Sequence, residues 1–181
     1  MPAIAHKHAH RTFSDLFTTW HRRQESRLLP MGAATIQGIT RKKCPDSAWK
    51  ISGRQSEWPT ILVEAAWSES KSTLKQDVLF WLQESEQEVK VVLTMKITPK
   101  GSITIERWIL KQEAESTFVE PIQTMRLIRN IGSNQPLITG SMHIQFEDCF
   151  LRPKRKNETD FILSNDDLTE IAEAVWSGLP K

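Results

Sequence analysis

Apolar residues recur at helical spacing near both ends of the chain. The stripe near the N-terminus comprises Phe13, Leu16, Phe17 and Trp20. These positions are i, i+3, i+4 and i+7, which predicts an amphipathic helix that continues through the charged HRRQES segment. The stripe near the C-terminus comprises Leu168, Ile171, Ala172, Val175 and Trp176. It follows Ser164, a suitable helix cap, and precedes Gly178 and Pro180, which predicts a helix that ends there.

Between these helices the pattern is that of strands interrupted by one more helix. Residues 46–51 alternate in polarity as a half-buried strand does, and TILVEAAW at 60–67 is apolar throughout except for Glu64. Such a continuous apolar run predicts a strand that is buried on both faces of a sheet. A helical stripe follows at Leu74, Val78, Trp81 and Leu82. Ser68 or Ser70 is expected to cap that helix.

The second half of the chain contains further strand patterns. Residues 89–97 and 103–110 alternate and flank the turn TPKGS, which predicts a β-hairpin. Weaker patterns predict strands within 31–40, 118–128 and SMHIQF at 141–146. The order of helix, strands, helix, strands and helix predicts an α/β (α+β) fold with a mixed sheet flanked by helices.

Composition favours one domain in a reducing compartment. The chain has 181 residues with 39% apolar content, enough for a continuous core, and residues 1–11 lack apolar periodicity. We therefore expect a disordered tail over 1–11 and a single domain over 12–181. Cys44 and Cys149 are too few for a disulfide scaffold and lack zinc-type spacing. With no apolar run of signal-peptide or membrane-spanning length, we expect an intracellular protein, cytoplasmic or nuclear, that has no membrane partner.

Three histidines stand at alternate positions in the expected tail: His6, His8 and His10. In an extended segment this spacing puts the imidazoles on one side, where they can hold a metal ion. The alternative is that the three histidines are incidental in a loose tail.

Two carboxylates are candidates for a second kind of metal site. Asp46 begins one predicted strand and Glu64 interrupts the next. If these strands are neighbours, both side chains can reach one spot, and Mg²⁺ or Mn²⁺ prefers oxygen ligands of this kind. A bound ion would also offset the cost of burying Glu64. Alternatively, Asp46 is a turn residue after Pro45, and Glu64 pairs with Lys50 or Arg54.

Several segments together resemble a known group of proteins. They are CPDSAW, WPTILVEAAWSES, LKQDVLFWL with the following hairpin, and the C-terminal ITGSMHIQFEDCFLRP and DDLTEIAEAVW. This combination resembles fungal proteins of unassigned function that are related to bacterial restriction endonucleases of the PD-(D/E)XK superfamily. The resemblance covers most of residues 11–178 and implies a restriction-endonuclease-like core.

The resemblance also implies roles for the acidic pair. In the superfamily the aspartate and glutamate bind the metal, and a lysine two residues after the glutamate orients or activates the attacking water. Carried over, Asp46 and Glu64 are the metal ligands, but the lysine position is Ala66. A methyl group can neither hold a hydroxide nor stabilise the charge of a phosphorane-like transition state. The departure therefore puts catalysis in doubt.

Other residues could compensate for Ala66. Some relatives carry the lysine on the next helix, which nominates Lys75 as the third catalytic residue, with Lys71 and Lys50 as further candidates. Glu25 matches an accessory acidic residue that some members carry in the first helix. The alternative is that each of these side chains is a solvated surface charge.

Basic residues gather in two places, although the net charge of +2 does not by itself indicate a polyanionic partner. The first cluster is Arg41, Lys42 and Lys43, and the second is Arg152, Lys154, Arg155 and Lys156. Both can contact phosphates without sequence specificity, or they are solvated loops. The string PKRK at 153–156 also resembles a short nuclear-import signal.

Three hypotheses of function follow. The one favoured by Ala66 and the balanced charge is a nuclease-like fold that has lost catalysis and serves as a nucleic-acid or protein binding module. The second is a Mg²⁺-dependent nuclease or phosphodiesterase that uses Asp46, Glu64 and a migrated lysine. The third is a fold turned to small-molecule chemistry in an apolar pocket, for which the seven tryptophans are suited. Trp20, Trp81 and Trp176 stand at helical spacing, however, and are interpreted as core.

Overall fold

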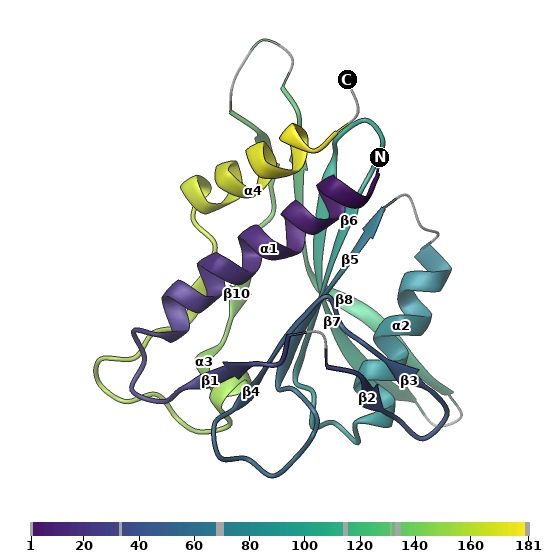
Figure 1. Cartoon of the computed structure of the whole chain (residues 1–181), viewed down its shortest axis with the longest axis vertical. Coiled ribbons are helices and arrows are strands. Elements are labelled where there is room, and N and C mark those ends of the chain that lie inside the picture. The colour runs from purple at the N-terminus through teal and green to yellow at the C-terminus, as the bar shows by residue number, and fades with distance from the viewer. Residues whose placement is uncertain are drawn as a thin grey trace.

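A seven-stranded mixed sheet forms the centre of the molecule (Figure 1). The structure is a computed structural model that describes residues 2–179, except 33, 68–70, 114–115, 131 and 133–134. The helices are α1 (Pro2–His21), α2 (Lys71–Glu84), α3 (Phe146–Phe150) and α4 (Asn165–Ser177). The strands of the main sheet are β1 (Leu28–Pro30), β4 (Ser47–Ile51), β5 (Ile61–Trp67), β6 (Val91–Ile97), β7 (Ile103–Glu113), β8 (Ser116–Ile128) and β9 (Leu137–Thr139). Two small ribbons pair β2 (Ile36–Gln37) with β3 (Lys42–Lys43), and β10 (His143–Ile144) with β11 (Phe161–Ile162).

The strands of the main sheet follow the order β1-β4-β5-β6-β7-β8-β9. Only β5 and β6 run parallel to each other, and α2 connects them, whereas the other neighbouring pairs are antiparallel. The predicted α+β class with a mixed sheet flanked by helices is therefore confirmed.

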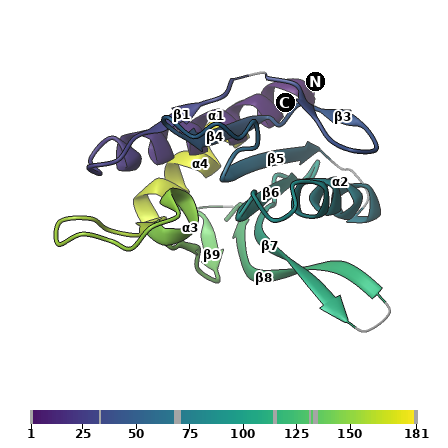
Figure 2. The ribbon, with the colours of Figure 1, turned by 90° about the horizontal axis from the view of Figure 1, so that it is seen from below.

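Helices cover both faces of the sheet (Figures 1 and 2). On one face α1 and α4 pack against each other, and α2 lies on the other face. Because successive side chains of a strand point to opposite faces, β5 contributes Ile61, Val63 and Ala65 to the core under α1 and α4. Leu62 of β5 packs instead in the core under α2, with Val78 and Trp81.

The first helix corrects the expected N-terminal tail. The prediction of disorder over 1–11 is wrong, because α1 begins at Pro2. Ala5 and Ala9 are fully buried and extend the stripe of Phe13 and Phe17 at intervals of four residues. Alanine has the highest helix propensity but little apolar area, so this part of the stripe carries a weak hydrophobic signal.

The same helix also ends earlier than its charge pattern suggested. It stops at His21 rather than continuing through HRRQES, and Glu25 lies beyond its end. The backbone N–H of Glu25 donates to the carboxylate of Glu158 at 3.3 Å, a contact that draws this segment toward the C-terminal part of the chain.

The other elements differ in how closely they match prediction. The strands at 46–51, 60–67 and 118–128, the hairpin, and the helices at 71–84 and 165–177 are confirmed. Ser164 caps α4 in a reciprocal capping box with Asp167, and Gly178 is its C-cap. Ser68 and Ser70, the expected caps of α2, and Pro180, which follows the C-cap of α4, lie outside the described residues. Trp81 is fully buried as expected, whereas Trp20 and Trp176 are partly buried at the edge of the core.

Two predicted strands shrink to two residues each. The segment 31–40 contributes only β2, and SMHIQF contributes only β10. The second segment turns into α3 at Phe146, whose backbone N–H is capped by Asp160 Oδ1 at 2.8 Å. Among the helices described, none combines the length and the apolar character that a bilayer crossing requires.

Candidate functional site

Asp46 and Glu64 occupy neighbouring positions where β4 begins beside β5, but their carboxylates have different partners. Ser47 pairs with Val63 in the antiparallel ladder, so Asp46 comes one residue before β4, next to the position of Glu64. Oδ2 of Asp46 accepts the backbone N–H of Ala65 at 2.8 Å. The Asp46 carboxylate therefore takes the place of a ladder partner for Ala65, which lies beyond the residues of β5 that pair with β4.

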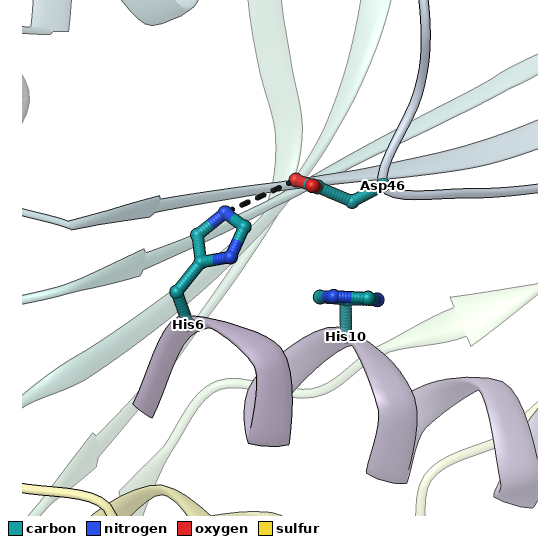
Figure 3. A group of neighbouring side chains, drawn as sticks. All are labelled: His6, His10 and Asp46. Carbon is teal, nitrogen blue, oxygen red and sulfur yellow. Dashed lines mark ion pairs between the residues drawn. The ribbon is translucent and has the colours of Figure 1, made fainter. Parts of the chain in front are cut away.

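Two histidines of α1 lie on one side of the Asp46 carboxylate (Figure 3). Nε2 of His6 lies 3.3 Å from Oδ2 of Asp46 and 2.9 Å from the carbonyl oxygen of Ala65. Nδ1 of His10 lies 3.1 Å from Oγ of Ser47. One ring nitrogen of each histidine and one oxygen of Asp46 all lie within 4.8 Å of one another.

The charge state of this cluster follows from its contacts. Burial raises the pKa of Asp46, but the hydrogen bonds from His6 and Ala65 outweigh it and lower the pKa below its ordinary value. Burial lowers the pKa of His10 despite the opposing charge of Asp46. At neutral pH the cluster thus contains an ionised carboxylate and a neutral His10 imidazole.

His8 lies apart from the other two histidines. Its Nδ1 is 2.7 Å from the carbonyl oxygen of Ala174 in α4. The expected alternation of three imidazoles along an extended segment is therefore wrong, because a helix brings together positions four apart and turns the intervening residue away.

Glu64 projects from β5 toward α2 and is 7% exposed. Its Oε1 accepts the indole N–H of Trp81 at 2.6 Å and lies 3.3 Å from Nζ of Lys43. The same ammonium lies 2.9 Å from Oδ2 of Asp77. Burial raises the pKa of Glu64 to about 7, against the opposing effects of Lys43 and Trp81, and the charge of Asp46 adds to the rise.

Lys43 is the lysine that contacts Glu64 within the described part of the chain. Burial lowers the pKa of Lys43, but Glu64 and Asp77 outweigh that effect and raise it, so the ammonium stays charged. Lys75 is exposed on α2, and Nζ of Lys50 lies 3.5 Å from the carbonyl oxygen of Ser56. The side chain of Lys71 lies outside the described residues.

The position of the superfamily lysine offers no polar group. Ala66 is 1% exposed in β5. Glu25 also lies apart from the acidic pair, since it follows the C-terminal end of α1 while His6 and His10 stand near the N-terminal end. Its partner is the guanidinium of Arg155.

The two basic clusters carry mostly paired charges. Arg41 contacts Asp77 at 3.2 Å, and Lys43 contacts Glu64 and Asp77 as described above. In the second cluster the ion pairs are Arg152 with Glu158, Lys154 with Asp160 and Arg155 with Glu25. Lys42 and Lys156 are exposed.

The ion pairs of the second cluster help to lower the pKa values of two of its carboxylates, Glu158 and Asp160. Hydrogen bonds from Arg152 lower the pKa of Glu158 to about 2. Burial acts to raise the pKa of Asp160, but a backbone N–H from Phe146 and hydrogen bonds from Lys154 and His143 lower it to about 2.

The sequence predicts other roles for Lys43 and Trp81 and assigns no site role to Asp77. It predicts Lys43 as a phosphate contact together with Arg41 and Lys42, and Trp81 as core alone. Asp77 and Trp81 are four residues apart on α2, so their common face was visible in the sequence. What the sequence did not show is that β3 brings Lys43 to that face.

Comparisons of the chain with protein-family models, with curated proteins and with solved structures found no match.

Proposed function

We propose that the chain is a non-catalytic domain with a restriction-endonuclease-like core that binds a protein partner. The mixed sheet flanked by helices and the placement of Asp46 before one strand and Glu64 on the next are in keeping with that core. We propose on this ground that the chain is related to the PD-(D/E)XK superfamily.

The observation that carries the loss of catalysis is the ion pair of Lys43 with Glu64. Mg²⁺ or Mn²⁺ would need Glu64 as an oxygen ligand, but Lys43 already supplies a positive charge at Oε1 and Trp81 donates to the same oxygen. Asp46 is held separately, by Ala65 and His6. With Ala66 at the lysine position, these residues do not fit a Mg²⁺-dependent nuclease site.

The charge distribution favours a protein over a nucleic acid as the partner. Binding to a phosphate backbone needs basic side chains that are available to the phosphates. Five of the seven basic residues in the two clusters already have a carboxylate partner. An apolar contact is available instead. Ile39 is 79% exposed between β2 and β3, beside a hollow lined by Leu79 and Phe80 of α2.

Cleavage and binding assays test both parts of the proposal. Wild type, Glu64→Gln, Lys43→Gln and Lys75→Gln are incubated with single- and double-stranded DNA and RNA in Mg²⁺ or Mn²⁺, with Lys42→Gln as the matched control. Binding to the same ligands is titrated at two salt concentrations. We expect no cleavage above the level of Glu64→Gln and no salt-sensitive binding.

Two results would contradict the proposal. Cleavage that is lost in Glu64→Gln and Lys43→Gln but kept in Lys42→Gln would establish a nuclease in which Lys43 is the migrated lysine, and loss in Lys75→Gln would assign that role to Lys75. Salt-sensitive binding that weakens in Lys156→Glu would establish a nucleic-acid binding module.

The protein partner has its own test. A partner cross-linked to the wild type should be lost in Ile39→Asp and kept in Ile162→Asp, a control that changes an exposed isoleucine of β11. A partner that persists in Ile39→Asp would place its binding site elsewhere and contradict the role of this surface.

A further inference from the structure

We propose that His6, His10 and Asp46 form a binding site for a divalent transition-metal ion of the Zn²⁺ class, which fastens the start of α1 to the junction of β4 and β5 (Figure 3). This site is independent of the proposed partner binding, and it shares Asp46 but not Glu64 with the acidic pair.

The first argument is geometric. His6 and His10 are four residues apart on α1, so their rings project from one face of the helix toward Asp46. Their ligand atoms and the Asp46 oxygen lie within 4.8 Å of one another. Ligand atoms of one tetrahedral Zn²⁺ lie roughly 3.3 Å apart, so side-chain rotations that close the gaps by about 1.5 Å suffice.

The second argument is the chemistry of the donor set. Two imidazoles and one carboxylate suit Zn²⁺ and neighbouring transition metals, whereas Mg²⁺ prefers oxygen ligands alone. Carboxylates bind such ions in the ionised form and imidazoles in the neutral form. Three protein ligands leave one coordination position for water, and the side chains of His6 and Asp46 are 28% and 24% exposed, which gives solvent a route.

The third argument is that neighbouring groups orient the ligands. The backbone N–H of Ala65 holds Asp46, and Oγ of Ser47 lies 3.1 Å from Nδ1 of His10. Oγ of Ser47 also lies 2.7 Å from Oγ of Ser14 in α1, whose hydroxyl donates to the carbonyl oxygen of His10 at 2.6 Å. Such supporting hydrogen bonds are typical of metal centres.

The contacts of His6 indicate which of its nitrogens would bind the metal ion. Its Nε2 faces the Asp46 carboxylate and the Ala65 carbonyl, both of which accept, so this nitrogen carries a proton between them. A metal ion bound at Nε2 would take the place of that hydrogen-bonded proton as the link between α1 and Asp46, and the proton would be released to solvent.

Metal affinity of the full chain, purified without an affinity tag, tests the proposal. Zn²⁺ is titrated against a competing chromophoric chelator for the wild type and for His6→Gln, His10→Gln and Asp46→Asn. His8→Gln controls for a histidine on another face of the same helix, and Glu64→Gln controls for the acidic pair. We expect each ligand variant to bind at least about 10-fold more weakly and both controls to stay within about 3-fold of wild type.

X-ray absorption of the Zn²⁺ complex of the wild type keeps the test independent of how the variants fold. We expect two imidazoles and further oxygen ligands around the ion. A complex with no imidazole or one, or a wild type that binds no more Zn²⁺ than the ligand variants, would overturn the site. Equal weakening in Glu64→Gln would overturn it too, because the ion would then belong to the acidic pair.

Discussion

At the scale of single residues, Glu64 is a carboxylate in an environment with little water. A carboxylate on a strand buried on both faces loses its hydration, and this loss is costly unless charged or polar partners replace water. Lys43 and Trp81 supply those partners, and Asp77 holds Lys43 from the other side. The interior of the sheet near α2 thus contains a small polar network rather than a single buried charge.

This environment predicts a pH dependence of stability. The pKa of Glu64 is raised from 4.5 to about 7 in the fold, so between these values the native state binds more protons than the unfolded state. The free energy of unfolding should therefore fall as the pH rises from 4.5 to 7, and Glu64→Gln should lack this component. As the pH rises from 4.5 to 7, the free energy of unfolding of Glu64→Gln should increase relative to that of the wild type by up to about 3 kcal/mol, measured by urea denaturation.

The difference in free energy of unfolding between wild type and Glu64→Gln reports the titration of Glu64, because the other titrating groups are common to both proteins. The variant also changes the contact with Lys43, but this change shifts the difference at every pH alike as long as Lys43 stays charged. A difference that is the same at pH 4.5 and pH 7.5 would contradict the raised pKa.

At the scale of elements, regular patterns within one element were predictable and long-range contacts were not. The alternation in β6 and β7 and the stripes of α2 and α4 predicted these elements from local sequence. The backbone N–H of Phe146 at the start of α3 is bound by Asp160, and that of Glu25, after the end of α1, is bound by Glu158 from the C-terminal part of the chain.

In the candidate site, too, local features were predictable from the sequence and long-range contacts were not. The closeness of Asp46 to the strand of Glu64 followed from the strand pattern. The contact of Lys43 with Glu64 and Asp77, and that of His6 with Asp46, join elements that have no sequence relation to one another. Such pairings depend on the packing of α1, β3 and α2 around the sheet, which the sequence pattern did not specify.

The first half of α1 gives a direct test of this element. Ala9 is fully buried and Lys7 is exposed on the same helix, two residues away. Ala9→Asp should cost about 3 kcal/mol of unfolding free energy, because it buries an unpaired carboxylate. Lys7→Asp should change stability by less than about 0.5 kcal/mol, since the new charge is solvated near a helix N-terminus. Equal, small effects of both substitutions in urea denaturation would mean that this segment does not pack on the sheet.

At the scale of the whole molecule, the two cores are joined through the strands they share. In β5 and β6 alternate residues enter the core under α1 and α4 or the core under α2. Val91 and Leu93 belong to the first core, and Val92 between them belongs to the second. Disorder in either core would therefore disrupt the central strands, and with them the other core.

This arrangement predicts that the domain unfolds in one cooperative transition. Phe17→Ala removes a fully buried ring from the core under α1, and Trp81→Ala removes one from the core under α2. Each substitution should lower the free energy of unfolding by about 3 to 5 kcal/mol.

The indole N–H resonances of Trp49 and Trp81 report the two cores separately during urea denaturation. In the wild type both resonances should disappear at the same urea concentration. In Phe17→Ala both should move together to a lower concentration, although Phe17 lies in the core of Trp49 alone. If the Trp81 resonance kept its wild-type midpoint in that variant, the two faces of the sheet would unfold independently, and the shared strands would not couple them.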